Sequence, residues 1–204
     1  SETINMSIDP ILRTKLFIPP LREGTVSRPR LIERINQNID NKALLISAPA
    51  GFGKSTLLAE WSAQSTAPVC WVSLDKTEND PINFLSYLIA SVQSEYKNLG
   101  DTILNALRTP GSPSVKGLLN AWINEVAEHA KDFVLILDDF HHIQNQTVAD
   151  LICYLTENQP RQLHLLLASR AELPFSCSRL RAQGDLVDLG IADLRFTLDE
   201  STEY

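Results

Sequence analysis

The sequence is poor in cysteine, has no excess of positive charge and contains no long apolar run. Its three cysteines, Cys70, Cys153 and Cys177, are odd in number and irregularly spaced, so they fit neither a disulfide framework nor a zinc site. This usage indicates a reducing compartment, and we expect a cytoplasmic protein. No stretch approaches the length that spans a membrane, and the N-terminal residues lack the basic-then-apolar order of a signal peptide.

Acidic residues outnumber basic ones, with 25 Asp and Glu against 18 Lys and Arg and a net charge of −7. A surface of this sign disfavours contact with the phosphate backbone of nucleic acids, so we expect no direct DNA contact from this chain. Hydrophobic residues make up 44% of the 204 positions, which is enough for the core of one large domain with attached segments.

Short apolar runs alternate with helical patterns along the chain. The apolar runs predict buried parallel strands at residues 43–47, 69–74, 133–139 and 163–170. Helical spacing of apolar residues predicts helices at 29–40, 54–65, from Pro81 onward, at 115–130 and at 147–158. We therefore predict an α/β fold, a three-layer αβα sandwich with a mostly parallel central sheet.

The segment APAGFGKST, residues 48–56, lies between the first expected strand and the following helix. It matches the P-loop pattern at its Gly-Lys-Ser, with Ala48 in place of the first glycine. Backbone N–H groups of such a loop cradle phosphate, within a P-loop NTPase fold. We expect Lys54 to reach the β- and γ-phosphates, Ser55 to bind Mg²⁺ and Thr56 to lie near the α-phosphate. The candidate binding residues are Ala50, Gly51, Phe52, Gly53, Lys54, Ser55 and Thr56.

Two acids, Asp138 and Asp139, end the third expected strand. An apolar strand that ends in acid is the usual companion of a P-loop, and it predicts that Asp138 holds Mg²⁺. Asp139 has two interpretations: it is a catalytic base that polarises the attacking water, or it is a helix N-cap.

The fourth expected strand ends in Ser169 and Arg170. An arginine at this point predicts a sensor of the γ-phosphate, and the alternative is a structural salt bridge to Asp138 or Asp139. The carboxyl ends of parallel strands share one edge, where ligands bind in such folds. We therefore expect the P-loop, the acid pair and the arginine to converge.

Three further polar residues near these strand ends carry weaker signals. Asp75 follows the second expected strand and either positions water or a loop, or caps a turn. His141 and His142 follow the acid pair, but no further metal ligands are evident in the sequence. We interpret both histidines as loop residues.

With these motifs in hand, the sequence resembles the STAND class of P-loop ATPases, and more closely the nucleotide-binding domain of MalT-type regulators of the LuxR family. The similarity covers almost the whole chain and rests on the order and spacing of many segments. They include RTKLFIPP (13–20), TVSRPRLIERI (25–35), LLISAPAGFGKSTLLAEW (44–61), CWVSLDKTENDPINFLSYLIASVQ (70–93), FVLILDDFHHI (133–143), LLLASR (165–170) and LRAQGDLVDLGIADLRFTLDE (180–200).

The resemblance implies an ATP-driven switch with slow, Mg²⁺-dependent hydrolysis. In this family ADP is held at rest, ATP binding promotes self-association, and hydrolysis resets the state. The stretch before the first helix contacts the adenine in such proteins. Here that stretch corresponds to Thr25, Val26, Ser27 and Arg28, with backbone contacts from Val26 foremost. The family usually has glycine where Ser27 stands.

The resemblance also implies a domain layout and partners. Residues 1–30 form an extended segment that contributes to the nucleotide site, residues 31–198 form the P-loop domain, and residues 199–204 begin a further helical region. The pattern Thr197-x-x-Glu200 is a capping box that predicts this helix, although so short a pattern also arises by chance. We expect a larger protein to continue beyond Tyr204, with DNA bound only by a missing C-terminal domain and no contact with a membrane.

Three other classes of protein stay open at this point. An AAA+-type ATPase subunit requires an arginine finger and ring assembly. A P-loop kinase requires a pocket for a small acceptor and a basic lid, and no basic lid segment is evident. An adaptor protein requires no nucleotide affinity at all.

Overall fold

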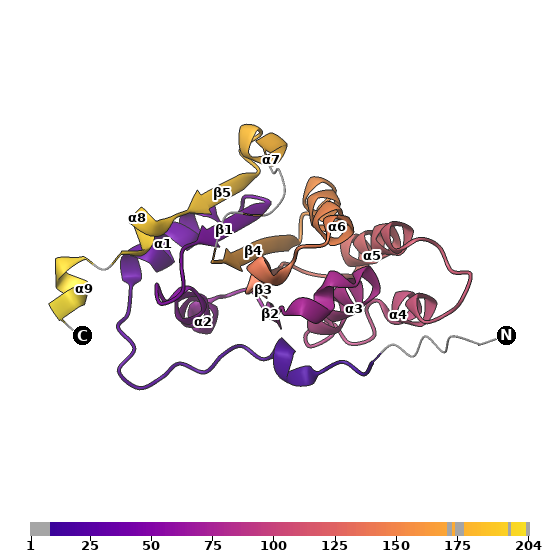
Figure 1. Cartoon of the computed structure of the whole chain (residues 1–204), viewed down its shortest axis with the longest axis horizontal. Helices are drawn as coiled ribbons and strands as arrows, with labels where there is room; N and C mark the ends of the chain where they lie inside the picture. The colour runs from indigo at the N-terminus through magenta and orange to yellow at the C-terminus, as the bar shows by residue number, and fades with distance from the viewer. Residues whose placement is uncertain (1–8, 171–172, 174–177, 196, 203–204) are drawn as a thin grey trace.

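The computed structural model describes residues 9–170, 173, 178–195 and 197–202. In this part of the chain, a five-stranded sheet has the order β2-β3-β4-β1-β5, and each neighbouring pair is parallel. Figure 1 shows helices on both sides of the sheet, so the predicted α/β fold is confirmed. The strands are β1 (Ala43–Ser47), β2 (Val69–Ser73), β3 (Phe133–Asp138), β4 (Leu163–Ser169) and β5 (Leu186–Leu189).

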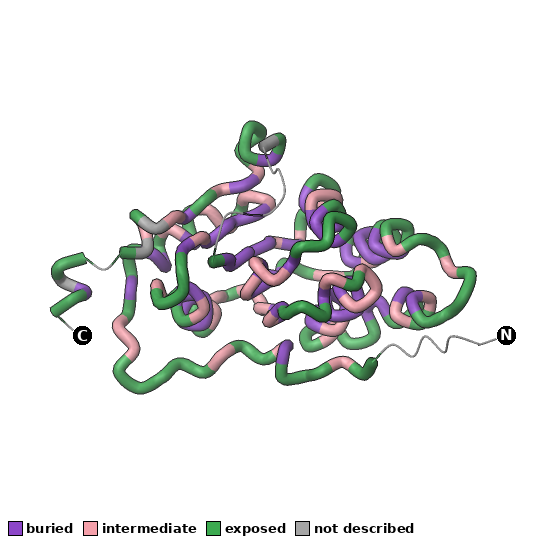
Figure 2. Tube along the Cα trace, viewed as in Figure 1, coloured by how far each residue is buried: buried purple, intermediate pink, exposed green. Residues whose placement is uncertain are grey.

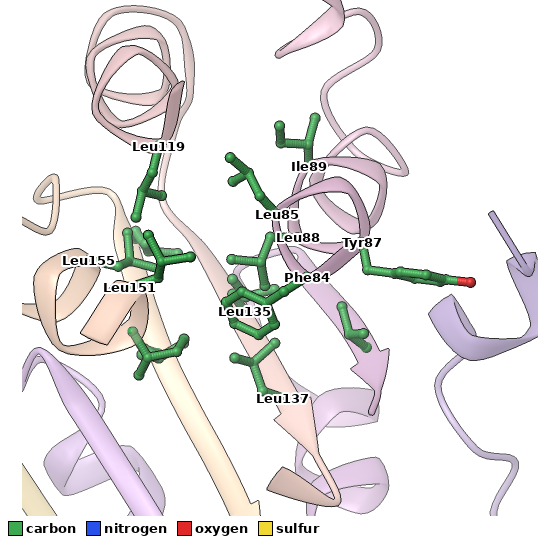
Figure 3. Packing of buried hydrophobic residues seen from close by; sticks show 14 of the residues in the cluster. Phe84, Leu85, Tyr87, Leu88, Ile89, Leu119, Leu135, Leu137, Leu151 and Leu155 are labelled. Atoms are coloured by element: carbon green, nitrogen blue, oxygen red, sulfur yellow. The ribbon is translucent and has the colours of Figure 1, made fainter. Parts of the chain in front are cut away.

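Helices cover both faces because successive strand side chains point to opposite sides of the sheet. Leu44 and Ile46 of β1 join one buried cluster, and Leu45 joins the other. Figure 3 shows Leu135 and Leu137 of β3 beside Phe84, Leu85 and Leu88 of α3 in the second cluster. The first cluster includes side chains of α1 (Pro29–Asn38) and α2 (Lys54–Gln64), and the second those of α3 (Pro81–Val92), α4 (Asp101–Leu107), α5 (Val115–His129) and α6 (Gln146–Glu157).

The predicted elements agree with the observed ones to within a few residues. The start of α3 follows its expected cap, since the Asp80 carboxylate accepts the N–H of Asn83 at 2.9 Å and Pro81 opens the helix. The apolar-run pattern does not predict β5, which pairs with β1. This strand has four residues and includes the exposed Asp188, so its own sequence carries little strand signal.

The N-terminal segment, residues 9–28, runs along one side of the domain before α1 begins (Figure 1). It is extended apart from a single turn of 3₁₀ helix, η1 (Arg13–Leu16), and most of it is exposed (Figure 2). The buried ammonium of Lys15 pairs with Glu78 and, at 3.0 Å, with Asp75. The Leu12 N–H donates to the Tyr87 hydroxyl at 3.0 Å, and Figure 3 shows this hydroxyl pointing out of the core toward η1.

The C-terminal elements are short. α7 (Ser178–Ala182) and α8 (Ile191–Leu194) flank β5, and α9 (Leu198–Thr202) follows. The predicted capping box is confirmed, since Thr197 N–H donates to Glu200 Oε2 at 2.7 Å and Glu200 N–H to Thr197 Oγ1 at 3.3 Å. Cys177 and residues 1–8, 203 and 204 lie outside the described residues. Within the described part, no helix has the length and apolar character needed to cross a membrane.

Candidate nucleotide site

The loop between β1 and α2 carries the predicted phosphate-binding residues. Gly51 and Gly53 have φ angles of 88° and 74°, a left-handed conformation that favours glycine. Gly53 is the N-cap of α2, and no side chain among the described residues caps this helix. Its first N–H groups therefore remain available to an anion. Ala50 is exposed on the loop, and Phe52 packs partly against the core.

The side chain of Lys54, the first residue of α2, folds back over the loop. Its ammonium donates to the carbonyls of Ala48 and Pro49, the latter at 3.0 Å, and 8% of the residue is exposed. Burial lowers the pKa of Lys54, and so does Arg170, whereas the carboxylate of Asp138 raises it. The charges of Asp138 and Arg170 therefore act on the Lys54 ammonium in opposite directions.

Ser55 and Asp138 are 83 residues apart in the sequence, yet Ser55 Oγ donates to Asp138 Oδ2 at 2.7 Å. The contact arises because Asp138 ends β3 and Ser55 lies in the first turn of α2, at the same edge of the sheet. Burial raises the pKa of the Asp138 carboxyl, while the hydrogen bond from Ser55 opposes that shift. The two predicted metal ligands are therefore in direct contact.

Asp139 adopts a left-handed backbone conformation, with a φ angle of 57°. Such an angle is uncommon for a residue other than glycine, and strained residues of this kind gather at functional sites. Its N–H donates to Asp138 Oδ1 at 2.8 Å. Asp139 occupies the N-cap position of η3 (Phe140–His142), but its side chain accepts no capping hydrogen bond. The carboxylate is therefore not used as a helix cap.

Arg170 directly follows β4 and is exposed. Within the described ranges no ion pair joins its guanidinium to Asp138 or Asp139, so the salt-bridge alternative is not realised there. Its backbone N–H donates to His141 Nδ1 at 3.3 Å. The strand end that carries Arg170 lies beside the start of the P-loop, since the Ala48 N–H donates to the Ser169 carbonyl at 3.2 Å.

A cavity of about 310 Å³ lies beside the P-loop, between the N-terminal segment and α2. Three of the residues predicted to contact the base line it, namely Thr25, Val26 and Arg28. Ser27 does not; its hydroxyl donates to the carboxylate of Glu60 instead. The other lining residues are Arg22, Glu23, Gly24, Gly51, Gly53, Thr56, Leu57 and Glu60.

Arg28 joins the N-terminal segment to the P-loop. One guanidinium nitrogen donates to the Phe52 carbonyl at 3.0 Å, and 4% of the residue is exposed. Burial lowers the pKa of Arg28, and the carboxylate of Glu200 opposes that shift. This contact holds the cavity wall against the loop that was predicted to carry the phosphates.

Glu60, which was not among the residues predicted from the sequence, is 7% exposed and lines the cavity from α2. It lies four residues after Thr56, and residues at this spacing share one face of a helix. Since Thr56 was expected to face the nucleotide, the same spacing could have identified Glu60. Its acidic side chain within the apolar helix LLAEW was a second signal.

Asp75 caps a turn, which is the structural one of its two predicted roles. Its carboxylate accepts the N–H of Thr77 at 2.8 Å and forms a capping box with Glu78 in η2 (Lys76–Asn79). Partial burial raises its pKa, but hydrogen bonds from Thr77 and Lys15 prevail and lower it to about 2. Asp75 thus helps to anchor the N-terminal segment rather than to position water.

Asn79 connects η2 to the loop that follows the acid pair, a link the sequence analysis did not predict. Its amide donates to the His142 carbonyl at 2.8 Å, and its oxygen accepts the N–H groups of Gln144 at 2.7 Å and Asn145 at 2.9 Å. The rings of His141 and His142 lie 4.4 Å apart. In the described part of the chain, no three His, Cys, Asp or Glu side chains are grouped to hold a metal ion.

The fold and the loop between β1 and α2 define a P-loop nucleotide-binding domain. Residues 37–175 match the family model described as the AAA domain, and the chain belongs to this family.

The chain is also similar to much longer proteins. It is 30% identical over 196 residues to the HTH-type transcriptional regulator MalT of Serratia proteamaculans, across 95% of this chain and 21% of that protein. It is 29% identical over 189 residues to the serine/threonine-protein kinase PknK of Mycobacterium tuberculosis, across 91% of this chain and 17% of that protein. The chain therefore spans about a fifth of the length of the MalT relative. The predicted relation to the MalT-type nucleotide-binding domain is confirmed.

Solved structures share the fold. The Walker-type ATPase PABY2304 of Pyrococcus abyssi has a TM-score of 0.54 at 15% identity, covering 90% of this chain and 57% of that chain. Cdc6p from Pyrobaculum aerophilum has a TM-score of 0.50 at 14% identity, covering 84% of this chain and 46% of that chain. These similarities support the P-loop fold.

Proposed function

We propose that this chain is the nucleotide-binding switch domain of a signal-transducing regulator, and that it binds ATP or ADP together with Mg²⁺. The observation that carries the proposal is the contact between Ser55 Oγ and Asp138 Oδ2 at 2.7 Å. It joins the hydroxyl of the P-loop to the acid that ends β3. These are the two protein oxygens that P-loop proteins offer to the metal.

The phosphates would lie on residues 50–56. The N–H groups of the loop and the N-terminus of α2 supply donors, and Lys54 supplies a positive charge. Mg²⁺ prefers oxygen ligands and keeps several of its waters, which suits a site where Ser55 and Asp138 provide two oxygens. When bound, the ion neutralises negative charge on the phosphates.

The adenine would occupy the cavity of about 310 Å³. The cavity adjoins Gly53 and Thr56, so it would receive a base attached to phosphates on this loop. Val26, which lines the cavity, would offer backbone contacts to the base, and Leu57 also lines the cavity. In this proposal the N-terminal segment, assigned to residues 1–30, would contribute one wall of the site through residues 22–28, and residues 31–198 would form the P-loop domain.

In this proposal Asp139 polarises the attacking water, and Arg170 contacts the γ-phosphate. Hydrolysis by the chain alone should be slow, because many P-loop enzymes need an arginine supplied by a second molecule. ATP and ADP would favour different arrangements of the loops that carry these two residues. The difference in affinity of each nucleotide for the two arrangements would set the fraction of molecules in each one. In a longer, cytoplasmic regulator of the MalT type, this difference would control self-association, and another part of that protein would bind DNA.

The proposal is tested by identifying the ligand. The purified chain is denatured, any released nucleotide is identified by chromatography, and the refolded or fresh chain is titrated with Mg-ATP, Mg-ADP and Mg-GTP. We expect one adenine nucleotide per chain and weaker binding of guanine nucleotides. If no nucleotide binds, the proposal is wrong and an adaptor role takes its place.

An AAA+-type ATPase subunit is the second candidate, because the chain belongs to the AAA domain family. Such a subunit would form rings in which a neighbour contributes to hydrolysis, so its activity per chain would rise steeply with concentration. Measuring ATP turnover across size-exclusion fractions separates the two functions. The switch predicts slow turnover at every concentration.

A further inference from the structure

Glu60 is a buried carboxylate whose hydrogen-bonding capacity is only partly used by the described residues. It is 7% exposed and lines the cavity of about 310 Å³ from α2. Its Oε1 accepts the hydroxyl of Ser27, and within the described ranges its side chain has no other hydrogen-bond donor and no ion pair. A carboxylate offers about four lone-pair sites, and a buried charge without partners costs free energy. Oε2 therefore remains able to accept a hydrogen bond from a ligand in this cavity.

Glu60 differs from the other polar side chains that line the cavity. The second carboxylate among the described lining residues, that of Glu23, is exposed, so water competes for its hydrogen bonds. The hydroxyl of Thr25 already has a partner, since it donates to the Arg22 carbonyl at 2.6 Å. A carboxylate accepts hydrogen bonds and donates none. Glu60 is therefore suited to recognise a ligand group that presents a donor to the buried part of the cavity.

The position of Glu60 on α2 indicates which part of a nucleotide it would meet. It lies four residues after Thr56, which shares its face of the helix and is expected to lie near the α-phosphate. Four residues advance an α-helix by about 6 Å, and long side chains on a helix lean back toward its N-terminus. The carboxylate of Glu60 therefore lies over the turn that begins at Thr56. The sugar directly follows the α-phosphate in a nucleotide and carries hydroxyl donors, so the carboxylate would meet the sugar before the base.

We propose that Glu60 binds the sugar of the nucleotide, with Oε2 accepting the 2′- or the 3′-hydroxyl of the ribose. Oε1 stays bonded to Ser27, so one carboxylate holds both the N-terminal segment and the ligand. This contact selects nucleotides that carry the hydroxyl over those that lack it, whatever their base. The inference rests on the proposed function, since it requires the phosphates to lie on the P-loop.

The test compares the dissociation constants of Mg-ADP, Mg-2′-deoxy-ADP and Mg-3′-deoxy-ADP by isothermal titration. One of the two deoxy analogues should bind the unaltered chain roughly tenfold to hundredfold more weakly than ADP, the usual range for a hydrogen bond to a charged group. The analogue that is affected identifies the hydroxyl. Glu60→Met removes the acceptor and keeps an unbranched side chain. This variant should bind ADP and the affected analogue equally, because both changes remove the same interaction.

Two further variants separate the sugar contact from general stability. Glu23→Gln alters the exposed carboxylate of the same cavity, so this matched control should keep the full preference for ADP over the deoxy analogue. If Glu60→Met does not fold, Ser27→Ala/Glu60→Met replaces both partners of the hydrogen bond and leaves neither one unpaired. The double variant should also bind ADP and the deoxy analogue equally.

Four results would overturn the inference, and they differ in what else they affect. Equal binding of ADP and both deoxy analogues by the unaltered chain removes the sugar contact and leaves the proposed function intact. A preference that persists in Glu60→Met assigns the hydroxyl to another residue. Purine riboside diphosphate lacks the amino group of adenine, and if Glu60→Met abolishes only the preference for ADP over this analogue, the carboxylate contacts the base. A chain that binds no nucleotide contradicts both the inference and the proposed function.

Discussion

The two halves of the candidate site are held by different kinds of structure. The phosphate half lies on β1, α2, β3 and β4, where regular elements bring Lys54, Ser55 and Asp138 together. The base half is formed by residues 22–28 of an irregular segment that lies against α2. That segment is held by a few side-chain contacts, including Ser27 with Glu60 and Arg28 with Phe52.

This difference means that the two halves should fail separately. Tripolyphosphate can report on the phosphate half alone, while ATP requires both halves. A variant of the first half should lose both ligands, and a variant of the second half should lose ATP and keep tripolyphosphate. Of the variants that follow, the first should abolish ligand binding altogether, and the others are given in order of decreasing effect on stability.

Lys54→Ala should abolish the thermal stabilisation caused by Mg-ATP and by tripolyphosphate. A ligand at about 100 times its dissociation constant stabilises the folded state by about 2.7 kcal/mol, which corresponds to roughly 5 to 10 °C for a domain of this size. Differential scanning fluorimetry measures the shift. Lys131→Ala, which alters an exposed lysine far from the loop, is the control and should keep the full shift. An unchanged shift in Lys54→Ala would exclude the loop as the phosphate site.

Lys15→Met should destabilise the chain by about 3 to 5 kcal/mol, because it leaves the fully buried carboxylate of Glu78 without its cation. Urea denaturation measures the loss. The double variant Lys15→Met/Glu78→Gln removes both charges and should recover much of it.

The same pair of variants probes the base half. Since Lys15 anchors the segment that continues into the cavity, the double variant should bind ATP more weakly and tripolyphosphate normally. If the affinities for ATP and for tripolyphosphate fall equally, the segment supports the whole site and the two halves are not separable.

Ser27→Ala should destabilise the chain by about 1 to 2 kcal/mol, because the buried Glu60 loses a hydrogen-bond donor. Its affinity for ATP should fall several-fold with no change for tripolyphosphate, as measured by isothermal titration. Ser27→Thr keeps the hydroxyl and serves as the control. A loss of tripolyphosphate binding in Ser27→Ala would contradict the assignment of Ser27 to the base half.

Asp75 should give the smallest effect, a dependence of stability on pH. Its folded-state pKa of about 2 lies below the ordinary 3.8, so its contribution is present above about pH 4 and is lost as the pH falls toward 2. The side chain is half exposed, so solvent screening limits the contribution to less than about 1 kcal/mol. Comparing the acid unfolding of Asp75→Asn with that of the unaltered chain isolates it. If stability falls in parallel for Asp75→Asn and for the unaltered chain as the pH drops from about 4 to about 2, the coupling between Asp75 and Lys15 is excluded.

The same contrast explains what could be predicted from the sequence. Strands β1 to β4 and the residues at their ends follow from continuous apolar runs and from one motif, so the contact between Ser55 and Asp138 was foreseeable. The short strand β5 was not, because four residues with an exposed acid acquire strand structure only through pairing with β1. The contacts of Ser27 with Glu60 and of Lys15 with Glu78 join distant, irregular segments, which no local periodicity encodes.

The most direct test of the central claim is a map of backbone amide chemical shifts during titration with Mg-ADP. The account predicts that the largest changes fall on Gly51, Gly53 and Ser55 in the P-loop and on Thr25 and Val26 across the cavity. Changes confined to the separate cavity between η1 and α4, lined by Leu16, Phe17 and Leu104, would contradict it.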